Sequence, residues 1–272
     1  MNRISAKIFL TAAIFGLFCC FSSPARADGD TASLTVSEIV SKANLAAYYA
    51  GDDGRATVKM TITDSQKRVR EREFTILRLD QEDGGRQMFF VYFKKPNDVK
   101  GMVFMVHKHI DRDDDRWLYL PALDLVKRIA ASDKRTSFVG SDFFYEDVSG
   151  RGLNEDEHKL IETTDKYYIL ENRPKDPDSV EFSSYKIWID RQNYIPVKAE
   201  YKDKEGQLYR RVTALEIKDI SGFPSVTKSR VENLASGSST VSKFSRIKYN
   251  IGLKDKLFSE RYLRRPPRQA RR

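Results

Sequence analysis

The spacing of apolar residues along the chain first follows a helical period and then changes to a period of two. The helical stretch begins at Thr35, which forms the capping-box pattern of a helix N-terminus with Glu38. Gly51 is suited to end the helix because glycine adopts a positive φ without strain. Between these points apolar residues recur at helical spacing, at Ile39, Val40, Ala43, Ala46 and Ala47. The pattern predicts one amphipathic helix from Thr35 to about Ala50.

From residue 55 onward, short apolar segments are separated by glycine, proline, asparagine and aspartate. These features are typical of β-strands joined by turns. Because no helical pattern stands between successive strands, we expect an antiparallel meander rather than a parallel sheet, in a single mainly β domain with a few helices. The predicted strands are 55–63, 68–80, 86–93, 101–109, 116–120, 125–130, 158–163, 166–172, 184–190, 195–202, 207–218, 225–233 and 240–250.

The earlier predicted strands are apolar on both faces, unlike the later ones. Residues 88–93, MFFVYF, and 102–106, MVFMV, lack a polar face, whereas residues 195–202 alternate between apolar and charged side chains. One interpretation is that a helix covers the second face. The other is that this face lines a cavity for a hydrophobic ligand. Residues 141–149, SDFFYEDVS, are predicted to add a short helical lid or plug.

The N-terminal segment has the pattern of a secretory signal peptide. Arg3 and Lys7 precede an apolar run, and the small residues of the sequence ARA offer a cleavage site after Ala27. The run is too short to span a membrane, which takes about 20 residues. Cys19 and Cys20 both lie in this segment, so a mature chain that begins at residue 28 has no thiol chemistry. The chain is therefore predicted to be exported.

The positive charge of the chain is concentrated near the C-terminus. The formal net charge is +9, and removal of the predicted leader, with three basic residues, lowers it to +6. Residues 264–272 are predicted to be a basic, disordered tail because Pro266 and Pro267 disfavour regular structure. Such a tail is suited to anionic lipid head groups or an acidic partner. Export argues against nucleic acid as a partner.

The acidic run DRDDD resembles a calcium-binding loop only in part. Asp111, Asp113 and Asp115 alternate as the ligands of an EF-hand do. However, Arg116 stands where the loop needs glycine, and Ala122 where it needs a bidentate glutamate. We therefore interpret the run as a solvated turn between two strands.

A second candidate metal site is the sequence HKH. His107 and His109 point the same way on a predicted strand, and Asp111 continues that face, which suits Zn²⁺. The cluster lacks a clear fourth ligand, so neither a metal nor another cofactor is predicted. The Gly-x-Ser-x-Gly motif of serine hydrolases does not occur. Adjacent Glu146 and Asp147 are interpreted as solvated or helix-capping carboxylates, and the protein is predicted not to be an enzyme.

Three stretches resemble bacterial periplasmic lipoprotein carriers of the LolA and LolB type. They resemble more closely the outer membrane lipoprotein-sorting proteins found beside transporters of the resistance-nodulation-division (RND) type. The stretches are FFVYFKKPNDVKGMVFMVHKH, DDDRWLYLPALDLVKRIAASDKRTSFVGSDFFYEDVSGR, and YKIWIDRQNYIPVKAEYKDKEGQLYRRVTALEIKDISG with KLFSERYL near the end.

This resemblance implies a half-open antiparallel β-barrel, wrapped around or capped by helices, that encloses a hydrophobic cavity. A single LolA-like carrier domain is expected over residues 28–263, between the signal peptide of residues 1–27 and the basic tail. The resemblance also implies a periplasmic location and an arginine that ties the lid to the barrel. Arg55 and Arg72 are the candidates for that arginine by position.

The function expected from the resemblance is the transfer of lipid or lipoprotein acyl chains between envelope components, in outer membrane lipoprotein sorting. The alternatives are a non-enzymatic accessory protein of an RND-type inner-membrane transporter, and an envelope lipid hydrolase. A monomer with peripheral membrane contact is expected, and nucleic acid is not a partner. The predicted lipid-binding residues, chosen by alternation, are Phe90, Tyr92, Met102, Phe104, Trp117, Tyr119 and Phe143.

Overall fold

The computed structural model describes residues 34–272, in which strands predominate. The helices are α1 (Val36–Tyr48), α2 (Glu146–Ser149), α3 (Arg261–Arg264) and α4 (Arg268–Arg271). The strands are β1 (Asp53–Thr63), β2 (Val69–Asp80), β3 (Gln87–Lys95), β4 (Val103–Lys108), β5 (Asp115–Leu120), β6 (Leu125–Ile129), β7 (Asp156–Thr163), β8 (Tyr167–Pro174), β9 (Phe182–Asp190), β10 (Pro196–Asp203), β11 (Leu208–Ile220), β12 (Phe223–Asn233) and β13 (Ser238–Tyr249). Each predicted strand corresponds to one of these.

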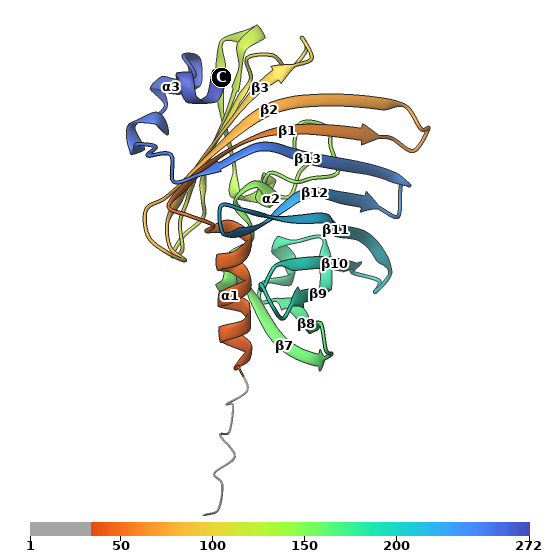
Figure 1. The fold of residues 1–272 in the computed structure, drawn as a ribbon. Helices are drawn as coiled ribbons and strands as arrows, with labels where there is room; N and C mark the ends of the chain where they lie inside the picture. Colours follow the sequence, from red (N-terminus) through yellow and green to blue (C-terminus); the bar gives the residue numbers. More distant parts are fainter. Residues whose placement is uncertain (1–33) are drawn as a thin grey trace, which may run out of the picture. The chain divides into compact units, whose positions relative to one another are not determined.

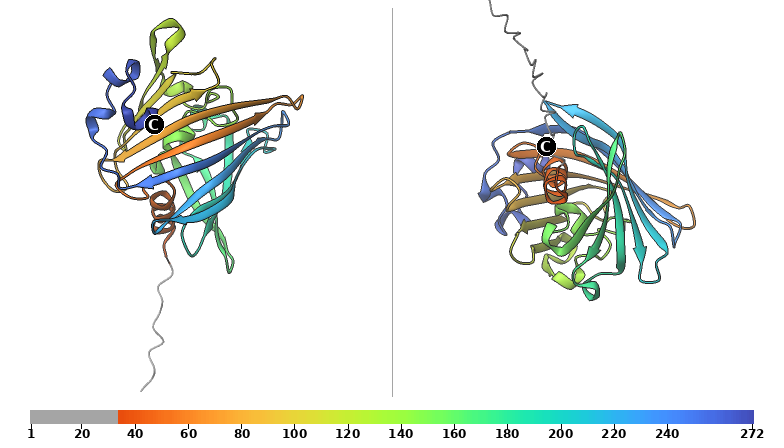
Figure 2. Two further views of the ribbon diagram at one scale, coloured as in Figure 1. Left: turned by 45° about the horizontal axis from the view of Figure 1, so that its top comes forward. Right: turned by 90° about the horizontal axis from the view of Figure 1, so that it is seen from below.

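All strands join in one antiparallel sheet, in the order β6-β5-β4-β3-β2-β1-β13-β12-β11-β10-β9-β8-β7. Strands that are neighbours in the sequence pair as a meander within β1 to β6 and within β7 to β13, and the first and last strands, β1 and β13, pair with each other in the middle. The sheet curves around α1 and the α2 region (Figures 1 and 2). It does not close, because β6 and β7 are its two edges. The predicted half-open antiparallel fold is confirmed.

Helix α1 begins as the sequence predicts. Thr35 is its N-cap, and the backbone amide of Thr35 donates to the Glu38 carboxylate at 2.7 Å while the Glu38 amide donates to the Thr35 hydroxyl at 3.3 Å. The helix ends at Tyr48, slightly earlier than predicted, and Gly51 follows with a φ of +67°. Ile39 and Ala43 are buried against the inner face of β8 and β9.

A segment that we call the plug, residues 131–155, links β6 to β7 and contains α2. Phe138 of the plug is 2% exposed and packs among the rings of Phe74, Phe93, Phe104 and Tyr145, with ring centroids 5.5 to 6.2 Å away. These contacts fix the plug against the concave face of the earlier strands. The predicted short helical piece at residues 141–149 is therefore present, as α2 within this segment.

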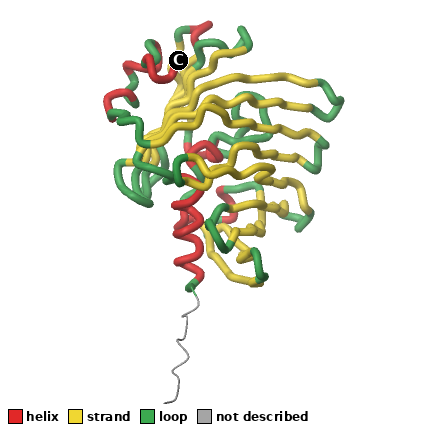
Figure 3. The backbone as a smooth tube through the Cα atoms, in the orientation of Figure 1, coloured by secondary structure: helices red, strands yellow, loops and turns green. Residues whose placement is uncertain are grey.

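A second segment, the strap, comprises residues 253–272 and contains α3 and α4 (Figure 3). Its apolar residues cover the outer face of β2 to β5, where Leu77, Phe90 and Met105 are fully buried. Asp53 holds the start of the strap by accepting the Leu253 amide at 2.8 Å. The apolar residues of the strap in this layer are Leu253, Leu257, Phe258, Leu263 and Ala270.

Residues 264–272 differ from the disordered tail that the sequence predicts. They include α4, and Ala270 is completely buried on the sheet. The two prolines end α3 and begin α4, and apolar residues between the arginines anchor the segment. Among residues 34–272 no helix is both long and apolar enough to cross a membrane. The predicted signal peptide, residues 1–27, lies outside the described residues.

Candidate functional site

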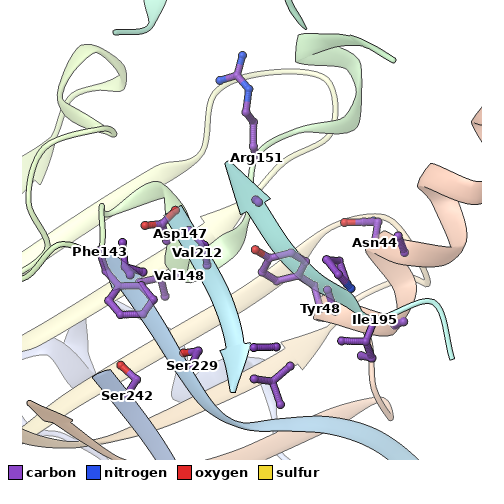
Figure 4. A pocket seen from close by; sticks show the side chains of 18 of the residues that line it. Asn44, Tyr48, Phe143, Asp147, Val148, Arg151, Ile195, Val212, Ser229 and Ser242 are labelled. Atoms are coloured by element: carbon purple, nitrogen blue, oxygen red, sulfur yellow. The ribbon is translucent and has the colours of Figure 1, made fainter. Parts of the chain in front are cut away.

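A cavity of about 510 Å³ lies on the concave face of the sheet, between α1, the plug and the strands β1 to β3 and β9 to β13. Figure 4 shows Tyr48 of α1, Asp147 and Val148 of the plug, and Val212 of β11 around it. Its size lies within the 300–1,000 Å³ typical of small-molecule sites. Apolar side chains of its wall include Val40, Ala43, Ala46, Ala56, Val58, Ile76, Phe143, Val148, Ile187, Ile189, Val212, Ala214, Val231 and Phe244.

The apolar wall follows from the alternation of the strands. In a strand successive side chains point to opposite faces, so Val212 and Ala214 of β11 share the concave face while Thr213 points away. On the α1 side, the wall is made of small residues, including Ala43 and Ala46. Small side chains on the helix leave the space that larger ones would fill.

One end of the cavity is polar and carries three buried arginines. Arg135 of the plug donates from Nε and Nη2 to Glu181 at 2.8 and 2.6 Å, and from Nη1 to Glu146 at 2.6 Å. Arg151 donates from Nε and Nη2 to Asp156 at 3.0 and 2.9 Å. Its Nη1 lies 2.8 Å from the Glu155 carboxylate. All nitrogens of these two guanidinium groups therefore face carboxylates.

The third arginine, Arg210 of β11, is paired much less completely. Its Nη2 donates to the Asp147 carboxylate at 2.5 Å. The side chain is 2% exposed, and its Nε and Nη1 have no hydrogen-bond partner among the described residues. The guanidinium carbon lies 4.4 Å from the ring centroid of Phe144 and 5.1 Å from that of Tyr201.

Two tyrosines beside this end remain neutral phenols at physiological pH. Burial raises the pKa of Tyr48, and the nearby Asp147 carboxylate raises it further. Burial also raises the pKa of Tyr201, although Arg210 and Arg135 oppose that shift. Both residues line the cavity, so its polar end offers hydroxyl groups as well as arginine donors.

The predicted lipid-binding residues fall on two faces of the sheet. Phe143 lines the cavity, and Met102 and Phe104 lie in the core beneath the plug on the concave side. Phe90, Tyr92, Trp117 and Tyr119 lie instead on the outer face, in the layer covered by the strap. Alternation separates the two faces of a strand but does not tell which one is concave. Their role in lipid binding stays a prediction, and the cavity wall is formed largely by other residues.

The candidate metal ligands from the sequence are held by protein contacts. His107 Nε2 lies 2.7 Å from the Phe258 carbonyl oxygen in the strap. His109 Nε2 lies 3.0 Å from Asp115 Oδ2, and Arg112 also donates to that carboxylate. Among residues 34–272 no three histidine, cysteine or acidic side chains are grouped as metal ligands.

The lid arginine that the resemblance implies is not at either position suggested. Arg55 donates to the Gln269 carbonyl of the strap at 2.9 Å, and Arg72 pairs with Asp98 at 3.2 Å. Arg210 of β11 forms an ion pair with Asp147 of the plug. A signal was present in the sequence, because Arg210 shares one face of its strand with the apolar Val212 and Ala214.

A family model described as "Uncharacterized protein" matches residues 85–265. A comparison with curated proteins gave no match. The chain is also similar to several solved structures. A DUF1329 family protein from Desulfovibrio piger is 29% identical, with a TM-score of 0.76, over 85% of this chain and 100% of that one.

An outer membrane lipoprotein-sorting protein domain from Vibrio parahaemolyticus is 28% identical, with a TM-score of 0.75, over 83% of this chain and 97% of that one. A LolA superfamily protein from Nitrosomonas europaea is 22% identical, with a TM-score of 0.65, over 85% of this chain and 100% of that one, and shares the fold. These similarities confirm the resemblance that the sequence indicates.

Proposed function

Since this chain belongs to the family whose model matches residues 85–265, and has the LolA-like fold of outer membrane lipoprotein-sorting proteins, we propose that it carries the acyl chains of a lipid or lipoprotein between components of the cell envelope. A periplasmic location is part of this proposal. The observation that carries it is the apolar cavity of about 510 Å³ on the concave face.

Acyl chains suit this cavity because their binding needs no precise polar contacts. Burial contributes about 0.8 kcal/mol for each CH₂ group, so the hydrocarbon of two or three acyl chains is enough for firm binding without any polar contact. Most of the wall is apolar, and the polar groups are gathered at one end. Release requires no chemistry, because a chain moves to any acceptor that buries it better.

The outer surface of the strap supports contact with an anionic membrane during loading or delivery. Its buried side covers the sheet, so its charged residues face solvent. The strap carries eight exposed basic residues and two exposed acidic ones, Asp255 and Glu260. Anionic head groups attract such basic clusters. The basic residues are Lys254, Lys256, Arg261, Arg264, Arg265, Arg268, Arg271 and Arg272.

Purification of the exported protein under native conditions, followed by solvent extraction and mass spectrometry, tests this function. We expect acyl lipid or lipoprotein in stoichiometric amounts. An empty protein that copurifies with an RND-type transporter would instead support an accessory role. An empty protein that turns over an ester substrate would support a lipid hydrolase, and either result would refute the carrier.

A further inference from the structure

The unpaired donors of Arg210 distinguish it from the other buried arginines of the cavity. Arg135 and Arg151 have carboxylate partners for every guanidinium nitrogen. Arg210 is buried more deeply than either but uses one nitrogen, and its Nε and Nη1 remain without partners in residues 34–272. Buried donors without an acceptor are destabilising, and most such groups in proteins find a partner. Because Arg210 lines the cavity, a bound molecule is the partner best placed to supply the missing oxygen atoms.

The charge of the surroundings indicates which kind of oxygen atom fits. Among the ion pairs at this end of the cavity, Arg210 takes part only in the one with Asp147, which neutralises it directly. An additional anion at the free N–H groups would lie beside the Asp147 carboxylate, whereas a neutral carbonyl oxygen accepts from them without adding charge.

We infer that Arg210 recognises the ester or amide carbonyl at the root of an acyl chain whose hydrocarbon lies in the apolar part of the cavity. The site therefore selects esterified or amide-linked acyl groups, as in acylated lipids and lipoproteins, over free fatty acids. This inference rests on the proposed carrier function and adds a specificity-determining residue to it. The neutral phenols of Tyr48 and Tyr201 stand at the same end, where they bring hydroxyl groups without charge.

Three probes of matched chain length test the inference: methyl palmitate, hexadecyl methyl ether and palmitate. Affinities are measured by displacement of a fluorescent fatty-chain probe from delipidated protein. The wild type should bind the ester roughly tenfold or more tightly than the ether, as expected for hydrogen bonds from a charged donor. Palmitate should bind less tightly than the ester. Arg210→Met should abolish the preference for ester over ether and leave the affinity for the ether nearly unchanged.

Arg211→Met is the matched control, because it removes an arginine from the same strand on the opposite face of the sheet, where Arg211 pairs with Glu200. This variant should keep the preference for the ester. If Arg210→Met does not fold, Arg210→Lys is used in its place, since it keeps the charge but lacks the guanidinium fork. It should also lose most of the preference for the ester.

A preference for the ester that survives in the Arg210 variant would overturn the inference, as would tighter binding of palmitate than of the ester by the wild type. Both results would leave the carrier function intact, because the chains still bind. Failure of the wild type to bind any of the three probes would refute the carrier function itself, and the inference with it.

Discussion

Phe138 and Phe143 allow a sharp test of how the plug is built, because they are the same residue type in two different environments. Phe138 is 2% exposed and packs among four aromatic rings. Phe143 is half-buried and lines the cavity. A Phe→Ala change in a packed core typically costs about 3–5 kcal/mol, through lost transfer free energy and the void left behind.

We therefore expect Phe138→Ala to lower the free energy of unfolding by about 3–5 kcal/mol. Phe143→Ala should cost less than about 1.5 kcal/mol, because its side chain borders space that is already open. The assay is urea unfolding monitored by circular dichroism, in which the loss of stability appears as a lower urea midpoint at an unchanged slope. Equal losses in the two variants would refute the difference in packing between these two phenylalanines, both of which border the cavity.

Three further predictions concern the cap, the ion pairs and the strap. Thr35→Ala removes the capping box of α1 and should lower the free energy of unfolding by about 1 kcal/mol, measured by chemical denaturation. Burial alone would raise the pKa of Glu181, but hydrogen bonds from Arg135 lower it to about 2. The stabilisation by this ion pair is therefore complete above the unfolded pKa near 4.5 and lost as the pH falls through about 2, so the stability curves of wild type and Glu181→Gln should converge over that window. Reversal of Arg265 and Arg268 to Glu should weaken sedimentation with anionic vesicles roughly tenfold or more at low salt and leave neutral vesicles unaffected. Equal binding to both kinds of vesicle would contradict the proposed membrane contact.

Local signals were sufficient for most of the fold. The capping box at Thr35 and Glu38 is a short-range pattern, and the structure forms it with the partners the sequence predicts. The strands were predictable because period-two alternation and turn residues act within a few residues of each other. The hairpin of Trp117 to Ala130 was also predictable, since Pro121 interrupts the apolar run where the turn forms.

The long-range arrangement of the strands and the C-terminal segment was harder to predict from the sequence. Phe90 and Phe104 are both buried aromatic residues in strands, yet one lies beneath the strap and the other beneath the plug. Sheet curvature and the return of the C-terminal segment decide between the two faces, and neither leaves a local pattern. Ala270 is buried on the sheet, but in the sequence it stands among the arginines of residues 264–272. One apolar position is too few to give a periodic pattern, so the sequence did not indicate this contact. Arg210 could have been noticed as a charged residue that shares its strand face with the apolar Val212 and Ala214.

The most direct test of the carrier account is to fill the cavity and leave the rest of the protein unchanged. Ala214→Trp places a large side chain inside the cavity, whereas Thr213→Trp, one residue earlier on β11, places it on the opposite face of the sheet. Both proteins should be folded by circular dichroism. Native mass spectrometry should show bound lipid in the wild type and in Thr213→Trp, and an empty protein in Ala214→Trp. Equal lipid occupancy in the two folded variants would contradict the claim that this cavity holds the acyl chain.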